Sequence, residues 1–170
     1  MIIGVPQEIK IGETRVSMTP SLCRRCVSLG AQVLVQKSAG ARSGFTDEEY
    51  RAAGATLVST ARKVWSQAEM ILKVKEHQPS EYPLIRPGQI LFCYFHFAAS
   101  KELTRALLKT RSVAIAYETI RLDSGEHPLL TPMSEVAGKM AIQEGAKYLE
   151  RSMGGKGILL GGVPGVRRGR

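Results

Sequence analysis

The chain has 170 residues, a formal net charge of +9, 44% hydrophobic residues and 23% charged residues. This length and composition are typical of a soluble globular protein with one full core, and no apolar run is long enough to cross a membrane. The N-terminus lacks the basic region and the cleavage pattern of a signal peptide, so we expect a cytoplasmic protein.

The positive charge does not by itself indicate a nucleic-acid partner. Basic residues are spread along the sequence and cluster tightly only in the C-terminal RRGR, and the few aromatic residues do not alternate with a basic stripe. Proteins that bind nucleic acids usually gather such residues on one face. We therefore expect no nucleic-acid partner, whereas an anionic small substrate would need only one or two of these charges.

Three cysteines are present, and Cys23 and Cys26 form the motif CRRC. A zinc site needs four ligands at matching spacings, and no second pair follows. Both cysteines share one face of a predicted helix with Leu22 and Val27, so we interpret them as packed side chains rather than redox groups. We predict no bound metal.

Strands and helices alternate along the first half of the chain. Strands are predicted over 1–5, 31–36, 55–58 and 70–74. Thr19-Pro20 begins a helix that ends at Gly30, and Thr46 begins one that ends at Gly54. Hydroxyl side chains before a helix cap its first N–H groups, and glycine commonly ends it. A third helix is predicted over 60–67.

The second half continues this alternation. A buried strand begins at Ile90 and runs towards His96, and Ser100 caps a helix over 101–109. A further strand is predicted over 112–118. Thr131-Pro132 then begins the longest helix, roughly Pro132 to Met153, which a glycine pair ends. The alternation predicts an α/β fold with a doubly wound, mostly parallel open sheet of the Rossmann or flavodoxin type, followed by a long C-terminal connecting helix.

Polar side chains follow several of the predicted strands. They are Arg15, Lys75, Tyr94, His96, Tyr117 and Glu118. Open α/β sheets bind ligands at the carboxyl ends of their strands, so we expect these residues at one edge. Taken singly, a histidine is more often a core residue, and a basic residue at a strand end is usually only solvated.

Together these residues suit a small 2-oxo or 2-amino acid. The guanidinium of Arg15 and the ammonium of Lys75 would bind its carboxylate, one as a fork and the other as a point charge. The imidazole of His96 could then move a proton near neutral pH. Neither a G-x-G-x-x-G turn after a strand nor a phosphate-binding P-loop occurs. The first turn of the long helix still offers Ser134 and backbone N–H groups to a cofactor.

Seven segments are distinctive as a set. They are MIIGVPQEIKIGETRVSMTP, AGATLV, ILKVKE, RPGQILFCYFHFAAS, AYETI, PLLTPMSEVAGKMA and GGKGILLGGVPGV. As a set they resemble the N-terminal region of the alanine dehydrogenase family, from Met1 to about Val166. In that family L-alanine is oxidised to pyruvate and ammonia with NAD. The related transhydrogenase α subunit shares the EIKxGExRV start but differs at FHFAAS and TPMSEVAG.

The resemblance implies roles for five residues. Arg15 and Lys75 match ligands of the substrate carboxylate, and His96 matches the catalytic histidine. Met133 matches a position that lines the substrate, and Ser134 one that faces the nicotinamide.

The resemblance also implies a domain organisation. Residues 1–130 would form the substrate-binding α/β domain, 131–153 the connecting helix and 154–170 a tail towards an NAD-binding domain, which holds most of the cofactor. Without that domain we expect the chain to be inactive, and we expect the complete enzyme to be a homo-oligomer. Two alternatives stay open: a transhydrogenase-type domain, and a non-catalytic module that binds small carboxylates through Arg15 and Lys75.

Overall fold

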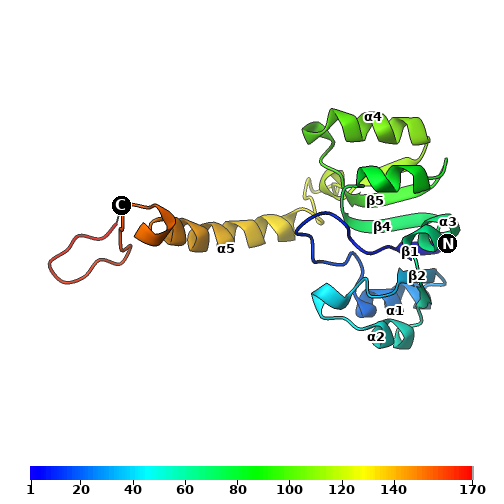
Figure 1. Ribbon diagram of the computed structural model, residues 1–170, viewed down its shortest axis with the longest axis horizontal. Coiled ribbons are helices and arrows are strands. Elements are labelled where there is room, and N and C mark those ends of the chain that lie inside the picture. The colour runs from blue at the N-terminus through cyan, green and yellow to red at the C-terminus, as the bar shows by residue number, and fades with distance from the viewer. Residues whose placement is uncertain (170) are drawn as a thin grey trace. The chain divides into compact units, whose positions relative to one another are not determined.

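The computed structural model describes residues 1–169 and contains two compact units (Figure 1). The first unit spans Met1–Ile120, and the second begins at Arg121. The functional division into 1–130, 131–153 and 154–170 stays a prediction.

The first unit is built on a six-stranded sheet. Its strands are β1 (Ile2–Val5), β2 (Gln32–Gln36), β3 (Thr56–Val58), β4 (Met70–Lys75), β5 (Ile90–Tyr94) and β6 (Val113–Ala116). Every pair of neighbours is parallel, and the order is β3-β2-β1-β4-β5-β6. This order is that of a Rossmann sheet rather than a flavodoxin sheet. The predicted doubly wound α/β fold is confirmed.

Helices cover both faces of this sheet (Figure 1). One face carries α1 (Pro20–Ser28) and α2 (Asp47–Ala52), and the other carries α3 (Ala61–Gln67) and α4 (Lys101–Thr110). All four helices begin at a hydroxyl side chain that accepts a hydrogen bond from an N–H of the first turn. These residues are Thr19, Thr46, Thr60 and Ser100. Such caps satisfy N–H groups that have no partner within the helix.

Four 3₁₀ helices lie where the sequence predicts loops or a strand. They are η1 (Ala41–Ser43), η2 (Pro79–Leu84), η3 (Phe97–Ala99) and η4 (Tyr117–Thr119). Runs this short show no helical periodicity in sequence. The predicted strand 112–118 was too long, because the Thr119 hydroxyl donates to the Ala116 carbonyl and the chain turns there.

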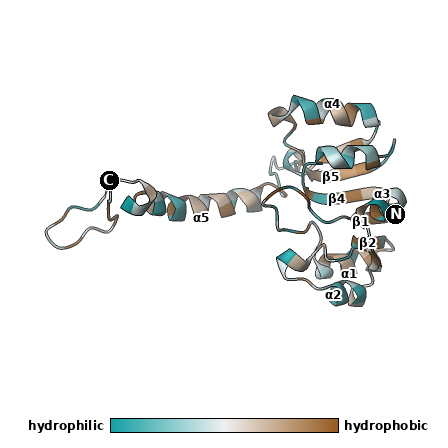
Figure 2. Cartoon of the chain, in the orientation of Figure 1, coloured by the Kyte–Doolittle hydropathy of each residue, from teal (hydrophilic) through white to brown (hydrophobic). Residues whose placement is uncertain are grey.

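Two apolar layers, one on each face of the sheet, form the core. Trp65 and Tyr50, with 1% and 0% of their surface exposed, are the largest buried side chains. Cys23 is buried beneath α1, as its helical spacing predicted. Gly4 lets α3 approach the sheet, since a Cβ there would lie 2.6 Å from the Cβ of Ala68. In Figure 2 the central strand β4 is correspondingly hydrophobic.

The second unit contains α5 (Thr131–Tyr148) and the 3₁₀ helix η5 (Arg151–Met153). The predicted start is confirmed, but the predicted end at Met153 was wrong. The backbone leaves the helix at Glu150, where ψ is 145°. The carbonyls of Leu149 and Glu150 accept instead from Gly157 and Gly155, whose chain folds back over the helix end. Periodicity in the sequence cannot show this local competition.

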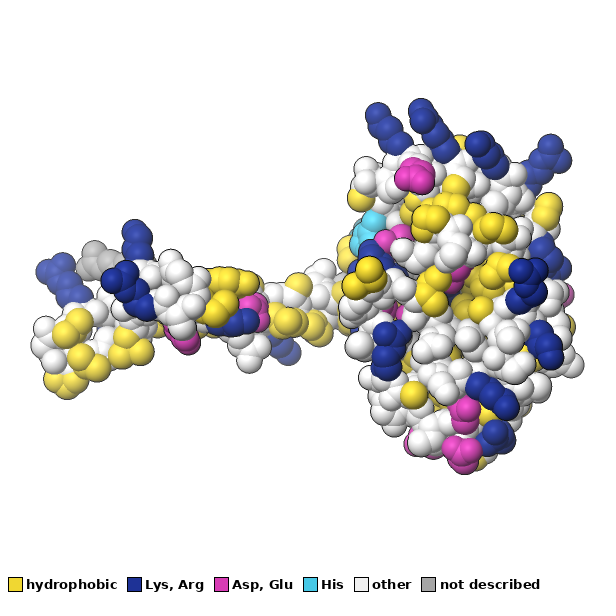
Figure 3. All heavy atoms as spheres, viewed as in Figure 1, with side chains coloured by type: hydrophobic (Ala, Val, Ile, Leu, Met, Phe, Trp, Pro, Cys, Tyr) yellow, Lys and Arg dark blue, Asp and Glu magenta, His cyan; other side chains and the backbone are white. Residues whose placement is uncertain are grey.

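Two surface properties bear on function. Over residues 1–169, no helix is both long and apolar enough to span a bilayer. On the face of the first unit seen in Figure 3, Lys and Arg side chains are scattered rather than gathered into one patch.

Candidate functional site

The candidate site lies at the carboxyl edge of the sheet, where the strand order reverses. The reversal falls between β1 and β4, which pair at Ile3–Met70 and Gly4–Ile71. The chain after β1 leads to α1 on one face, and the chain after β4 leads to η2 on the other. Such a divergence opens the crevice in which open α/β sheets bind ligands.

Arg15 comes from the loop after β1 and is held by Glu13. The Arg15 Nε and Nη2 atoms donate to the two Glu13 carboxylate oxygens at 2.8 and 2.6 Å, and its backbone N donates at 2.9 Å. The Glu13 side chain is only 6% exposed, whereas that of Arg15 is 47% exposed. Hydrogen bonds from Arg15 lower the pKa of Glu13 to about 2. Glu13 therefore stays charged and fixes one edge of the guanidinium, while much of the Arg15 side chain faces solvent.

Lys75 is the last residue of β4 and lies opposite Tyr94 in the β4–β5 register. Its positive charge acts on Glu13 and helps to lower the pKa of that carboxyl. Arg15 in turn acts on Tyr94, whose pKa burial raises. Arg15 and Lys75 therefore lie near the same acidic side chain, so two cations share this edge of the sheet.

His96 lies two residues beyond β5 in the left-handed region, with φ 53° and ψ 45°. This conformation is uncommon for residues other than glycine, and it concentrates at functional sites. The side chain is exposed, so His96 is not a core histidine. Its ring stacks on that of Tyr94, with centroids 6.2 Å apart.

Glu118 supports the unusual backbone of His96. It lies in η4 after β6, and its Oε1 accepts the His96 N–H at 2.7 Å. Its neighbour Tyr117 packs edge-on against Tyr94, with centroids 4.9 Å apart. Tyr117 is partly buried, and burial raises the pKa of its hydroxyl. The structure thus brings the six residues of the first unit together at one edge of the sheet, as the strand pattern predicted.

Met133 and Ser134 belong to the second unit. Both are exposed in the first turn of α5, with Pro132 before them. Their assignment to the substrate and the cofactor stays a prediction.

A buried polar group below the edge was missed by the sequence analysis. Lys73 is fully buried within β4, and its Nζ lies 2.6 Å from Glu81 and 3.6 Å from Glu8. His77 is also buried, and burial together with the charge of Lys73 lowers its pKa to about 3. The available signal was the lysine inside the apolar run MILKV, because a buried lysine needs a carboxylate partner.

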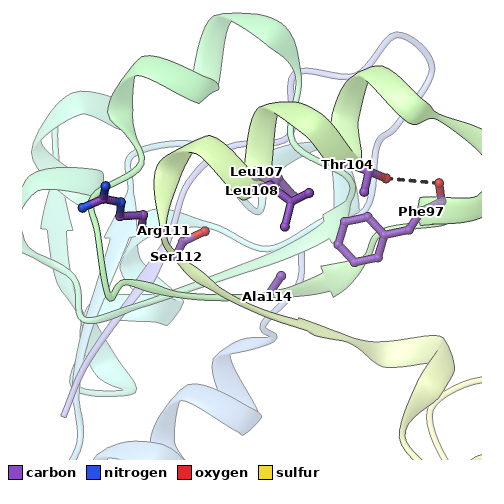
Figure 4. A pocket seen from close by; sticks show the side chains of 7 residues that line it. All are labelled: Phe97, Thr104, Leu107, Leu108, Arg111, Ser112 and Ala114. Atoms are coloured by element: carbon purple, nitrogen blue, oxygen red, sulfur yellow. Dashed lines mark hydrogen bonds between the residues drawn. The ribbon is translucent and has the colours of Figure 1, made fainter.

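A pocket of about 420 Å³ lies between α4 and β6 (Figure 4). It is lined mainly by apolar atoms from residues such as Phe97, Leu107 and Ala114, and Arg111 is the single ionisable residue in its lining. One ionisable group cannot both bind an anion and transfer a proton, so the polar edge is the better candidate for chemistry.

Comparison with known proteins identifies the family. The family profile described as "Alanine dehydrogenase/PNT, N-terminal domain" matches residues 4–137, and the profile of its C-terminal domain matches residues 141–170. The chain belongs to the alanine dehydrogenase/PNT family. The resemblance seen in the sequence is therefore confirmed.

Similar proteins within this family are alanine dehydrogenases. The chain is 55% identical to alanine dehydrogenase of Methanococcus maripaludis over 98% of its length and 54% identical to that of Geobacillus stearothermophilus over 100%. It spans less than half of each relative, 44% and 46%.

Among solved structures, an alanine dehydrogenase matches this chain better than a transhydrogenase does. An L-alanine dehydrogenase matches with a TM-score of 0.89 and 50% identity over 99% of this chain and 46% of that one. A transhydrogenase from Sinorhizobium meliloti matches with a TM-score of 0.65 and 29% identity over 69% of this chain and 34% of that one. The comparison supports alanine dehydrogenase over the transhydrogenase alternative.

Proposed function

We propose that this chain is the N-terminal, substrate-binding part of a cytoplasmic, NAD-dependent L-alanine dehydrogenase. The reaction converts L-alanine, NAD and water to pyruvate, ammonia and NADH. The observation that carries the proposal is the joint placement of Arg15, Lys75 and His96 at one sheet edge, within a segment that is about half identical to alanine dehydrogenases.

Arg15 and Lys75 bind the substrate carboxylate in this proposal. Glu13 holds the Arg15 guanidinium by two hydrogen bonds, and 47% of the Arg15 side chain is exposed, which allows contact with a ligand. Lys75 adds a second positive charge from the strand end. With Glu13 charged, the three side chains carry a net charge of +1, which one carboxylate neutralises. A charge-neutral complex favours a small monocarboxylate.

His96 transfers protons at the substrate carbon. After a hydride leaves Cα, water adds to the resulting imino carbon, and ammonia departs to give the ketone. The imidazole takes a proton from the attacking water and returns one to the leaving nitrogen, as a general base and then a general acid. Glu118 holds the left-handed backbone of His96 and so fixes the position from which the imidazole side chain extends.

NAD supplies the hydride acceptor when it is bound. Ser134 is assigned to hold the nicotinamide side, since its hydroxyl is exposed in the first turn of an 18-residue helix. Residues 1–169 include no G-x-G-x-x-G turn between a strand and a helix, so most contacts to the cofactor are assigned to the part of the relatives that this chain does not span. Met133 is assigned to the substrate, and the complete enzyme is expected to be a homo-oligomer.

The decisive test uses a chimera in which this chain replaces the matching part of the Geobacillus stearothermophilus enzyme. We expect the chimera to reduce pyruvate with NADH and ammonia, and the chain alone to be inactive. In the chimera, His96→Ala should lower kcat by about 10²–10⁴-fold, the usual contribution of a placed acid–base group. Arg15→Ala and Lys75→Ala should each weaken pyruvate binding by about 1.5–3 kcal/mol, the contribution of a charge-assisted hydrogen bond.

Lys63→Ala removes an exposed lysine from α3 and serves as the control. A folded chimera that binds NADH without turning over pyruvate or alanine would contradict the proposal. If that chimera still bound pyruvate through Arg15 and Lys75, the chain would be a carboxylate-binding module instead.

A further inference from the structure

The carboxylate of Glu8 takes the place of a strand partner at the end of β4. Its Oε1 accepts the Val74 N–H at 2.6 Å. The last β1 partner on β4 is Ile71, and the β4–β5 register shifts between Leu72 and Lys75. Val74 therefore lies where the regular pairing of the sheet is interrupted on one side and has ended on the other. A side chain supplies the acceptor that the sheet does not.

This contact is built into the core. The Glu8 side chain is 2% exposed, and it faces Lys73, which is 0% exposed. Lys73 donates to both oxygens of Glu81 at 2.8 and 2.6 Å, so its closest bonds go to that residue rather than to Glu8. The second Glu8 oxygen has no hydrogen bond among the described residues. The most direct interaction of Glu8 is thus with the backbone that leads into Lys75.

Glu8 also belongs to the loop that carries Arg15. Arg42 donates to the Glu8 carbonyl at 2.7 Å, and Ser43 donates to the Thr14 carbonyl at 2.9 Å, so this loop is anchored at several points. Further on, the Ser17 hydroxyl donates to the carbonyl of Leu72 in β4 at 2.8 Å. Glu8 is therefore one of several contacts between the loop of Arg15 and the end of β4, together with Ser17 on Leu72 and the ion pair of Lys10 with Glu76.

We infer that Glu8 is a positioning residue that sets Lys75 relative to Arg15 through its hydrogen bond to Val74, and so sets the spacing of the two cations for a small monocarboxylate. This inference rests on the proposed function, because it assigns the substrate carboxylate to those cations. Glu8 does not touch the substrate. Its charge is secondary, since Glu81 already pairs with Lys73.

Two substitutions separate the hydrogen bond from the charge. Glu8→Gln keeps the reach and the acceptor oxygen but removes the charge, whereas Glu8→Asp keeps the charge but withdraws the oxygen from Val74. In the active chimera we expect Glu8→Asp to raise the KM for pyruvate by about 10-fold, because small misplacements of a binding group are costly. The kcat at saturating pyruvate and the Kd for NADH should change by less than about 2-fold. Glu8→Gln should stay within about 2-fold of the parent in all three.

Glu48→Gln is the matched control, since this exposed glutamate pairs with Arg51 at the surface. The opposite ranking, with Glu8→Gln impaired and Glu8→Asp unchanged, would overturn the inference in favour of a structural ion pair. Equal losses in KM, kcat and NADH affinity would overturn it as well. An active parent in which Lys75→Ala weakens pyruvate binding, but neither Glu8 variant does, refutes this inference alone. An inactive parent, or a Lys75→Ala variant that binds pyruvate normally, refutes the proposed function and this inference with it.

Discussion

The two units of this chain obtain their structure in different ways. The first unit buries two apolar layers around its sheet and encloses the charges of Lys73, Glu8 and Glu81. None of the described residues from Arg121 to Gly169 is buried, and α5 rests on its own backbone hydrogen bonds. In proteins most of the stability of a helix comes from packing of one face, and α5 has no buried residue. The same chemical change should therefore have different effects in the two units, which matched substitutions can measure.

The largest difference in unfolding free energy is expected between the variants Lys73→Met and Lys147→Met. The first leaves the buried carboxylates of Glu8 and Glu81 without a cation, which typically costs about 3–5 kcal/mol of unfolding free energy. The second removes a pair with Glu144 whose side chains are 51% and 47% exposed, and it should change stability by less than about 0.5 kcal/mol. Far-UV circular dichroism follows urea unfolding of both units, and the fluorescence of Trp65, the chain's one tryptophan, follows the first unit alone. Similar losses for both variants would break the comparison.

Gly4→Ala and Gly138→Ala should change stability in opposite directions. A methyl group at Gly4 would lie 2.6 Å from the Cβ of Ala68, so overpacking should cost about 1–3 kcal/mol. At Gly138, in α5, a Cβ meets nothing within 4 Å, and alanine favours a helix by about 1 kcal/mol. We expect a lower urea midpoint for the first variant and a stronger helical circular dichroism signal for the second. A Gly4→Ala variant as stable as the parent would show that α3 can move away from the sheet.

Sequence reasoning predicted that the candidate residues share one edge of the sheet, because these residues follow a periodic pattern. Arg15, Lys75 and His96 each come after a run whose apolar character predicts a strand, and parallel strands place their ends at one edge. The start of α5 was equally readable, since Thr131-Pro132 is a local signal. The left-handed backbone of His96 could not be predicted from the sequence, because its hydrogen-bond partner Glu118 lies 22 residues away.

The buried charges show more clearly what the sequence alone cannot predict. The partners of Lys73 are Glu81, 8 residues later, and Glu8 in the loop after β1. The sequence marks Lys73 as unusual within an apolar strand, but only the folded sheet selects its partners among 15 acidic residues. Long-range pairing depends on topology, whereas caps and strand periodicity depend on neighbouring residues. The elements could therefore be predicted, and their cross-connections could not.

Acid should destabilise the first unit through His77. Burial, with a smaller effect of Lys73, lowers the pKa of His77 from 6.5 to about 3. Below pH 6.5 His77 binds a proton in the unfolded chain but stays neutral in the folded chain. Stability therefore falls as the pH falls. The slope should approach about 1.4 kcal/mol per pH unit. Glu13 has a pKa of about 2 against an ordinary 4.5, so its own contribution is lost only in that lower range.

Urea unfolding between about pH 5 and pH 6.5 follows mainly the histidine, because most carboxylates titrate below this range. Burial raises the pKa of Glu8, whose titration acts in the opposite direction, so the parent and the His77 variant are compared over the same range. His77→Phe keeps a ring beside Trp65 and Phe95, and it should flatten the slope. Far-UV circular dichroism is the suitable signal, since the His77 ring lies 5.3 Å from that of Trp65 and its protonation can alter the fluorescence. A slope unchanged by His77→Phe would assign the acid sensitivity to other groups.

The smallest difference is expected for two tyrosines that lose the same atom. The Tyr50 hydroxyl is buried and donates to the Met18 carbonyl at 2.6 Å, and burial raises its pKa to about 12. Tyr50→Phe leaves that buried carbonyl without its donor and should lower the unfolding free energy by about 1 kcal/mol. Tyr148, at the end of α5, is 59% exposed, and phenylalanine there keeps the ring beneath the Lys147 ammonium. Tyr148→Phe should therefore stay within about 0.5 kcal/mol of the parent. Both substitutions remove one hydroxyl from the same kind of ring, so their difference in urea unfolding measures the contribution of the buried hydrogen bond of Tyr50. Equal effects would contradict this difference between the two units.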